Sequence, residues 1–455
     1  MYENFFMMLK KLVYGICFGL SAQVYAIDLF ETYQKALSYN ADYLKAIATN
    51  QAGVEQQNIA FAALLPQISA TGTISENYLF QGGSYAYYNQ PTYAAQLNQV
   101  IFDFGKFSTY VKGEFATQLA DLQLTNAKQQ LMVNVAQAYF DVLFAEDTLL
   151  ATQMTKRALE KQMTQAKAAF EVGSVTIADV NDAQAAFDAS SAQEIQDQNN
   201  LINKKNVFRN LTGIDPEQIQ PLQENINLQL PKPSDSSPWS QIAESGNLNV
   251  KIANTQVSMA REDISISRAG HMPTINLTAQ YQYQDTGNLD SSNLPSSQLQ
   301  QLVGIPGSPL SSYGTGVIGV QVSVPILSGG GITAQVRQAI ANYEGSEDQL
   351  VSVERQTDQK IRNAYWQVQN GVSIVLAQKA ALKSAKTKLD SDMLGYQVGI
   401  RNSVDLVNSQ KNYYQTFQTY QQSRYQYLMA EAQLAYLSGQ IDDKFMQRLN
   451  GNIKY

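Results

Sequence analysis

Residues 170–179 read Phe-Glu-Val-Gly-Ser-Val-Thr-Ile-Ala-Asp, and residues 396–405 read Tyr-Gln-Val-Gly-Ile-Arg-Asn-Ser-Val-Asp. Each stretch places a Val-Gly pair between two long runs that are rich in Ala and Gln. The difference in residue number between these two stretches also relates 138–213 to 364–439, so the chain contains one pattern twice. A duplication of this kind determines the architecture before any single motif is considered.

Each Val-Gly pair predicts a corner between two helices. Gly173 and Gly399 suit the left-handed position that commonly ends a helix, because glycine has no Cβ to clash there. After the first glycine, Thr176 and Asp179 have the spacing of a capping box that begins the next helix, and residues 402–405 are the counterpart. The repeated unit is therefore predicted to be an antiparallel helical hairpin.

Proline usage separates the helical tracts from the rest of the chain. None of the 12 prolines falls in 92–215 or 326–455, the two tracts that hold the repeated pattern. A helix that continues from Lys106 to Val172 would be about 100 Å long at 1.5 Å per residue. A rod of this length must pack along its side against other helices.

Small and aliphatic residues provide a packing seam with heptad spacing along each long helix. The predicted seam comprises Leu131, Val135, Ala138, Val142, Ala145 and Leu149, and in the second copy Thr357, Ile361, Ala364, Val368, Gly371 and Val375. Many of these residues are small, which favours side-by-side helices in a large assembly. Large residues at helical spacing near the end of the chain are interpreted as packing rather than as a ligand-stacking surface. They are Tyr413, Tyr414, Phe417, Tyr420, Tyr425 and Tyr427.

Residues 1–26 have the pattern of a secretory signal, with Lys10 and Lys11 before an apolar segment and a small-residue cleavage site at its end. Translation from Met7 or Met8 would give a more usual spacing. The only cysteine lies in this segment, so disulfides and cysteine-based zinc chemistry are excluded for the exported chain. The net charge of −7 argues against nucleic-acid binding, which requires a basic surface.

Two pairs of strands are predicted, one before each long helix. Period-2 alternation indicates strands at 67–75 and 93–101 in the first half, and at 274–283 and 316–324 in the second. Polar connections at 82–92 and 285–314 join them, and 28–62 and 239–269 are predicted helices. The strands are long enough for a tilted membrane strand, although a soluble β-hairpin is the alternative.

These elements predict a chain built from two structural repeats. The expected organisation is a signal peptide at 1–26, a first repeat at 27–213 with strands about 66–104 and a hairpin at 106–213, a linker at 214–238, a second repeat at 239–440 with strands about 273–327 and a hairpin at 331–439, and a C-terminal tail at 441–455.

The chain resembles the TolC family of outer-membrane efflux proteins. The resemblance covers nearly all of residues 27–440 and rests on the signal peptide, the duplicated element order and the Leu-Pro-Gln-Ile strand start at 65–68. Its most specific part is the stretch 395–406. It implies a mainly α fold with a transmembrane β portion, in which three chains form a 12-stranded β-barrel continued by a periplasmic α-helical barrel.

The resemblance also implies a function, a location and partners. The expected function is a gated exit duct of the outer membrane that serves multidrug efflux, type I secretion or both. The expected partners are two further copies of the chain, a periplasmic membrane-fusion adaptor, an inner-membrane pump of the RND, ABC or MFS type reached through the adaptor, and outer-membrane lipid. The protein is then not an enzyme.

By resemblance, the hairpin corners carry the functional residues. Val172, Gly173, Val398 and Gly399 would form the tip that docks the adaptor. Tyr396 and Arg401 on the second hairpin would link to Asp179 on the first and hold the gate closed. Asp405 would form a ring of carboxylates at the pore constriction. Asn408 replaces a second family aspartate there, and Ala178 replaces a threonine beside the linking acid.

Two alternatives come from other classes of protein. A trimeric periplasmic coiled-coil adaptor would carry lipoyl-like and β-barrel modules beside one hairpin, whereas this chain has two hairpins. A hydrolase with paired carboxylates lacks a convincing catalytic constellation. His271 is the only histidine and is predicted to be structural or solvated, and Ser328–Gly331 lacks the Lys-Ser/Thr of a phosphate-binding loop. No catalytic, cofactor-binding or metal-binding residue is predicted.

Overall fold

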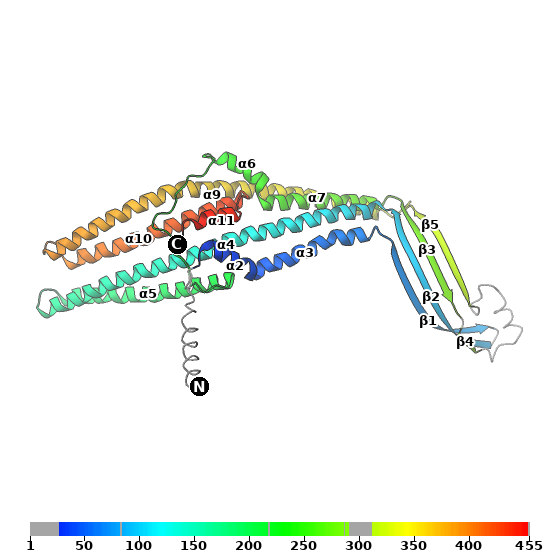
Figure 1. The fold of residues 1–455 in the computed structure, drawn as a ribbon, viewed down its shortest axis with the longest axis horizontal. Helices are drawn as coiled ribbons and strands as arrows, with labels where there is room; N and C mark the ends of the chain where they lie inside the picture. The colour runs from blue at the N-terminus through cyan, green and yellow to red at the C-terminus, as the bar shows by residue number, and fades with distance from the viewer. Residues whose placement is uncertain (1–26, 82–83, 217–218, 286, 291–311, 454–455) are drawn as a thin grey trace, which may run out of the picture. The chain divides into compact units, whose positions relative to one another are not determined.

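The computed structural model describes residues 27–81, 84–216, 219–285, 287–290 and 312–453 (Figure 1). The expected signal peptide at 1–26 lies outside these residues. The described chain is mainly helical, with one five-stranded sheet, and it divides into two compact units. One unit holds the hairpin corners and the other holds the sheet.

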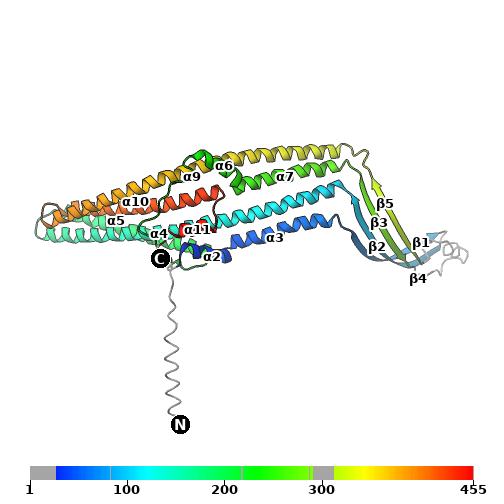
Figure 2. The ribbon, with the colours of Figure 1, turned by 45° about the horizontal axis from the view of Figure 1, so that its top comes forward.

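The hairpin unit comprises Thr125–Leu248 and Glu354–Tyr455 together with the chain up to Ala46. Its first hairpin pairs the end of α4 (Phe104–Glu171) with α5 (Ile177–Thr212), and its second pairs the end of α9 (Gly331–Gln397) with α10 (Ser403–Leu437). Figures 1 and 2 show α5 beside α4 and α10 beside α9. The predicted long helices and both predicted corners are confirmed.

The predicted seam is buried in this unit. Ten of its twelve residues are 7% exposed or less, and Leu149 and Gly371 are half-buried. Tyr420, Tyr425 and Tyr427 are also part of the apolar core, which confirms the packing interpretation for these three aromatic residues. The seam predicted from heptad spacing therefore faces neighbouring helices.

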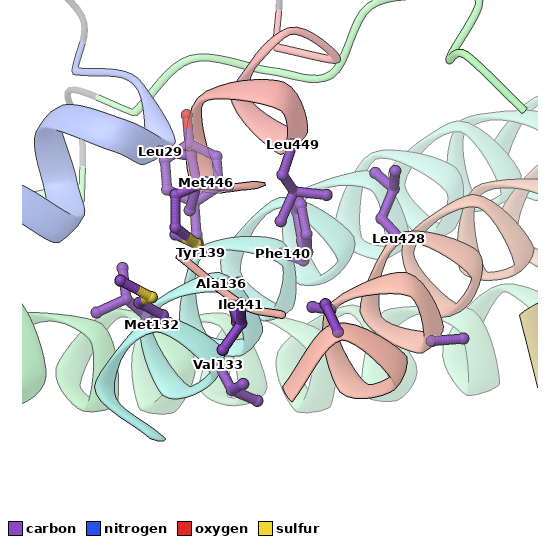
Figure 3. Packing of buried hydrophobic residues seen from close by; sticks show 14 of the residues in the cluster. Leu29, Met132, Val133, Ala136, Tyr139, Phe140, Leu428, Ile441, Met446 and Leu449 are labelled. Atoms are coloured by element: carbon purple, nitrogen blue, oxygen red, sulfur yellow. The ribbon is translucent and has the colours of Figure 1, made fainter. Parts of the chain in front are cut away.

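A second layer of core side chains comes from the two ends of the chain. Figure 3 shows Leu29 of α2 (Leu29–Tyr39) and Met446 of α11 (Asp443–Asn450) next to Tyr139 of α4. The Tyr139 hydroxyl donates a 2.7 Å hydrogen bond to the Gln220 carbonyl, which fixes the linker against the same helix. Part of the expected C-terminal tail thus belongs to the core, since Ile441, Met446 and Ile453 are 2% exposed or less.

Two of the predicted helices are each broken in two. Asn40 separates α2 from α3 (Ala41–Ala62), and Asn247 separates α6 (Ser236–Gly246) from α7 (Leu248–Ala269), where continuous helices at 28–62 and 239–269 are expected. Asn40 and Asn247 have extended backbones, with ψ of 117° and 126°. Each side-chain amide donates to a carbonyl at the end of a hairpin helix, Leu211 at 3.5 Å and Leu437 at 2.8 Å. These long-range contacts stabilise breaks that local helix propensity does not reveal.

The sheet unit comprises Ile47–Leu124 and Asn249–Val353. Its strands are β1 (Gln67–Gln81), β2 (Ser84–Phe102), β3 (Thr274–Gln284), β4 (Gly287–Asp290) and β5 (Tyr313–Ser323), in the antiparallel order β1-β2-β3-β5, with β4 paired to β2 (Figure 1). The four predicted strands are confirmed. The expected loop at 82–92 is wrong from Ser84 onward, because that segment is rich in tyrosine, which favours strands, and pairs with β1. Most of the expected connection at 285–314 lies outside the described residues.

Sharp turns lead from the sheet into the long helices. Gly329 and Gly330 have φ of 58° and 81°, and α9 begins at Gly331, which confirms the turn predicted for this glycine run. In the first half, the Asp103 carboxylate accepts a 3.1 Å hydrogen bond from the Lys106 amide at the start of α4. Among the described residues, no helix is both long and apolar enough to cross a bilayer.

The two faces of the sheet differ in polarity. Ile68, Leu97, Ala279 and Ile318 are paired across β1, β2, β3 and β5 and therefore lie on one face. The neighbouring row on the opposite face is Gln67, Asn98 and Thr278, which pairs with Gly319. Ile68 and Ile318 are 75% and 80% exposed. One face of the sheet is thus apolar and open, and the other is polar.

Candidate functional site

Both corners end their long helix with the same backbone geometry. Gly173 and Gly399 have φ of 74° and 76°, in the left-handed region. At each corner, the residue after the glycine donates a 2.8 Å hydrogen bond to the carbonyl five residues earlier in the chain. Together with the bond from the glycine amide, this is the Schellman motif. The Val-Gly pairs therefore form real corners.

The first corner is capped within its own hairpin. The Thr176 hydroxyl accepts a hydrogen bond from the Asp179 amide, and the Asp179 carboxylate accepts one from the Thr176 amide at 2.8 Å, which confirms the predicted capping box. The Thr176 hydroxyl also donates to the Asp179 carboxylate at 2.7 Å. These bonds lower the pKa of Asp179, because they stabilise its ionised form. Asp179 therefore stays charged at the exposed corner.

Apolar side chains are exposed at both corners. Val172 is 76% exposed at the first corner, and Val398 and Ile400 are 61% and 81% exposed at the second. Ile177 and Val404, in the first turns of the two outgoing helices, are more than half exposed as well. Solvent-exposed apolar clusters of this type mark surfaces that contact other molecules.

Arg401 is the charged centre of the second corner. Its Nε lies 3.5 Å from Asp392 Oδ1, and its Nη1 lies 3.6 Å from Asp405 Oδ2. The Asp405 amide donates a 2.8 Å hydrogen bond to the side chain of Asn402, the N-cap residue of α10. The structure therefore brings together Arg401 and Asp405, two of the predicted site residues, on one hairpin.

The other predicted site residues are not joined to Arg401. Tyr396 is half-buried on α9, and Asn408 is exposed on α10. Among the described residues, no ion pair joins Arg401 to Asp179, whose carboxylate is bonded to Thr176. The predicted link between the two hairpins stays a prediction.

Three residues near Arg401 were not predicted from the sequence: Lys388, Asp392 and Ser409. Asp392 is 5% exposed and receives hydrogen bonds from the Lys388 ammonium, at 2.5 Å, and from the Ser409 hydroxyl. Lys388 also donates to Ser409 at 2.6 Å. The hydrogen bond from Lys388 and that from Ser409 lower the pKa of Asp392, and Arg401 adds to this effect. The i,i+4 spacing of Lys388 and Asp392 was a usable sequence signal.

A second polar cluster connects the two hairpins. The Asp147 carboxylate on α4 accepts hydrogen bonds from Gln421 at 2.7 Å and Tyr425 at 2.8 Å, both on α10. Arg424, which is 4% exposed, donates to Gln421 at 2.6 Å and to the Gln223 carbonyl of the linker. Burial raises the pKa of Asp147, although the Tyr425 and Gln421 donors oppose it. This cluster holds the fold together and offers no free reactive group, since each of its side chains is hydrogen-bonded to another part of the fold.

The geometry offers little for catalysis or metal binding. In the part of the chain that the structure describes, no group of three or more His, Cys, Asp or Glu side chains is placed to hold a metal ion. His271 is exposed, as expected for a solvated residue. What the corners present instead is an apolar surface with fixed charges beside it, which is suited to contacts between proteins.

Comparisons with known proteins agree with this arrangement. Residues 32–214 and 239–440 match the family model described as outer membrane efflux protein. Outer membrane protein TolC of Salmonella enteritidis is 32% identical over 457 residues, which cover 98% of this chain and 90% of the relative. Alkaline protease secretion protein AprF of Pseudomonas aeruginosa is 26% identical over 446 residues, which cover 95% and 89%.

A solved structure has the same fold. The crystal structure of the CmeC outer membrane channel of Campylobacter jejuni matches with a TM-score of 0.75 at 17% identity, covering 94% of this chain and 90% of that chain. The names of these proteins describe channels and secretion components rather than enzymes.

Proposed function

The chain belongs to the outer membrane efflux protein family, and from this premise we propose that it is an exit duct of the outer membrane. It passes drugs or proteins from the periplasmic side to the exterior. The family description supports efflux, and the similarity to a protease secretion protein supports type I secretion. The protein lies in the outer membrane and extends into the periplasm.

The observation that carries this function is the sheet with one apolar and one polar face. Lipid requires an outward apolar surface, and strands that alternate apolar-out and polar-in satisfy this requirement while lining an aqueous interior. The row of Ile68, Leu97, Ala279 and Ile318 supplies the apolar surface. The open face would be unfavourable in water and is favourable in a bilayer.

The proposed closed trimeric barrel is supported by the unpaired edges of this sheet. β1 and β5 are edge strands among the described residues, and unpaired backbone groups cost several kcal/mol each in a bilayer. Three chains that each contribute four strands would form a 12-stranded barrel and pair every edge. The helical hairpins of the same three chains would continue it as an α-helical barrel in the periplasm.

The proposed domain organisation is two structural repeats, 27–213 and 239–440, after a signal peptide at 1–26. Residues 214–238 link the repeats, and the C-terminal tail at 441–455 follows them and contributes Met446 and Ile453 to the core. The division is supported by the family match, which interrupts at 214 and resumes at 239.

The proposed partners are two further copies of the chain, outer-membrane lipid, a periplasmic membrane-fusion adaptor and, through the adaptor, an inner-membrane pump of the RND, ABC or MFS type. The docking tip for the adaptor is assigned to Val172, Gly173, Val398 and Gly399. The exposure of both valines supports this assignment, because apolar side chains at an interface exclude water when a partner covers them.

The proposed gate lies at the same corners. Asp179, Tyr396 and Arg401 are assigned to links that join the two hairpins of neighbouring chains or of one chain in the closed state. Asp405 forms the charged ring of the pore constriction, and Asn408 forms a neutral ring one turn away. The position of Arg401 beside Asp405 supports placing both groups at one functional point.

Planar bilayers test the proposed duct directly. Trimers purified from outer membranes should show heat-modifiable mobility and give stepwise single-channel conductance. A cysteine in place of Ser312 should react with an impermeant maleimide on intact cells, whereas one in place of Ser174, exposed at the first corner, should react only after the outer membrane is permeabilised. Absence of conductance steps, or equal labelling at both positions, would contradict the duct and its orientation.

A further inference from the structure

The two corners share a backbone but differ in the side chains behind them. Lys388, Asp392 and Ser409 form a hydrogen-bonded group between α9 and α10 of the second hairpin. The repeat-equivalent positions in the first hairpin hold Gln162, Ala166 and Ala183. The second hairpin therefore carries an anchored, buried carboxylate next to its corner, and the first does not.

This carboxylate is one side of the site that holds the Arg401 side chain, which we call the seat and which Asp392, Asp405 and Gly395 form. The other sides are Asp405, 3.6 Å from Nη1, and Gly395, whose missing side chain makes room for the stem. A Cβ at position 395 would lie 2.8 Å from the Arg401 Cγ, which is closer than real Cβ contacts. The first hairpin has Ala169 and Val175 at these two positions, so it has neither the space nor the cation.

The seat holds its carboxylate firmly and its guanidinium loosely. Asp392 accepts hydrogen bonds from both Lys388 and Ser409, whereas the two contacts of Arg401 measure 3.5 and 3.6 Å. Strong charge-assisted hydrogen bonds of this kind are about 2.7–2.9 Å long. The Arg401 head group is also about half exposed. It can therefore exchange partners while Asp392 stays in place.

We infer that Asp392 is a positioning residue that retains Arg401 on its own hairpin and so competes with Asp179 for the guanidinium. The inference rests on the proposed gate, in which Arg401 closes the tip by linking to Asp179. A seated Arg401 is withdrawn from that link, and therefore the seat favours the open tip. Gate closure then includes the transfer of Arg401 from Asp392 and Asp405 to Asp179.

Single-channel recordings of purified trimers in planar bilayers test the seat. Asp392→Asn keeps the size of the side chain and removes its charge, and should lower the open-to-closed ratio by about 1.4- to 5-fold, the effect of one partly exposed ion pair. Asp392→Glu should retain most of the wild-type ratio. Asp390→Asn removes a charge from the exposed side of the same helix and should leave the ratio unchanged.

A second variant unseats Arg401 without altering any charge. Gly395→Ala places a methyl group against the Arg401 stem, in a helical position where the first hairpin already accepts alanine. It should lower the open-to-closed ratio as Asp392→Asn does. In an Arg401→Ser background, both changes should lose their effect on the ratio, since the group that they position is absent. A merely structural role would instead persist in that background and would appear as a lower melting temperature.

Each outcome decides a different question. Channels that respond to Asp392→Asn and Gly395→Ala only when Arg401 is present support the seat. If neither change alters the open-to-closed ratio, or if each alters it equally in the Arg401→Ser background, the seat is overturned and the duct still stands. Wild-type trimers that insert without producing conductance steps overturn both the duct and the seat.

Discussion

The Tyr425 hydroxyl donates a 2.8 Å hydrogen bond to the Asp147 carboxylate and thereby joins α10 of the second hairpin to α4 of the first. The same carboxylate oxygen accepts a hydrogen bond from Gln421. The Tyr425 ring lies about 6 Å, centroid to centroid, from Phe140 and Phe144, at 5.9 and 6.0 Å. The two halves of the duplicated chain are therefore joined by a polar contact inside an apolar surrounding, where an unpaired group is costly.

Tyr425→Phe should destabilise the fold by about 1–3 kcal/mol, the contribution of one hydrogen bond to a charged group, because Asp147 keeps only its Gln421 donor. The ring contacts with Phe140 and Phe144 persist in this variant, so the effect isolates the hydroxyl. The pKa of Asp147, already raised by burial, should rise further because a donor to the ionised form is removed. Chemical denaturation at neutral pH measures the change.

Tyr413→Phe is the matched control for this prediction, since Tyr413 lies on the same helix and its ring meets that of Tyr414 edge-to-face, with the centroids 5.2 Å apart. Its stability should stay within about 0.5 kcal/mol of wild type, as is usual for changes away from buried polar groups. Equal effects of the two substitutions would show that the Asp147 bond contributes nothing to the join.

Glu431→Gln should stabilise the protein increasingly as the pH rises. Burial raises the pKa of Glu431, although the Tyr427 hydrogen bond and Arg448 oppose it. A carboxyl group with a raised folded pKa contributes stability below its unfolded pKa and loses it as the pH rises through the folded value. Glutamine does not titrate and avoids this loss. Melting temperatures between about pH 4 and pH 8 should therefore diverge in favour of the variant.

Glu244→Gln removes the same charge from the exposed surface of α6 and should follow the wild-type melting profile at every pH. A constant difference between Glu431→Gln and wild type, independent of pH, would mean that the buried carboxyl group does not titrate in the tested range.

Local signals in the sequence predicted the elements whose causes are local. Gly173 and Gly399 end their helices because a left-handed residue is needed there, and the seam residues recur at a spacing that only a long helix explains. The breaks at Asn40 and Asn247 could not be predicted in this way. Each asparagine interrupts a helical pattern in order to bond a carbonyl at the end of a hairpin helix, Leu211 and Leu437, distant in the chain.

The candidate site divides in the same manner. The capping box of Thr176 and Asp179 depends on a spacing of three residues and was predicted correctly. The partners of Arg401 were not predicted, because several carboxylates lie within its reach and the sequence does not rank them. The structure selects Asp392 and Asp405, and Asp392 is held in place by Ser409 from the facing helix.

Gly399→Ala should destabilise the second corner by about 1–2 kcal/mol, because alanine is strained in the left-handed conformation. The space around Gly399 is open, so the cost is conformational and not steric. Gly345→Ala is the matched control, since Gly345 is exposed within helix α9 and its position is equally open. There the same substitution should stabilise by about 0.5–1 kcal/mol. Denaturation of both variants checks the opposite signs, and equal signs would contradict the corner geometry.

The ion selectivity of the duct should depend on the balance between Asp405 and Arg401. Three chains would place three Asp405 carboxylates at the constriction, each with Arg401 Nη1 at 3.6 Å from one of its oxygens. The Arg401 guanidinium partly neutralises the charge of the Asp405 ring, and Asn408 adds no charge one turn further along α10. Reversal potentials in a salt gradient should therefore show a moderate cation preference, with only modest block by multivalent cations.

Three substitutions separate these contributions. Asp405→Asn should reduce the cation preference without opening the pore, because it removes the ring charge and keeps the side-chain size. Arg401→Ser should increase the preference, since the carboxylates lose their compensating partner, and together with Tyr396→Phe it should also raise the conductance by releasing the proposed links. Asn408→Asp adds a second ring of three charges and should strengthen block by multivalent cations, since closely spaced carboxylates attract them more strongly. If Asp405→Asn leaves the reversal potential unchanged, the constriction lies elsewhere in the duct, and the assignment of the ring to Asp405 is wrong.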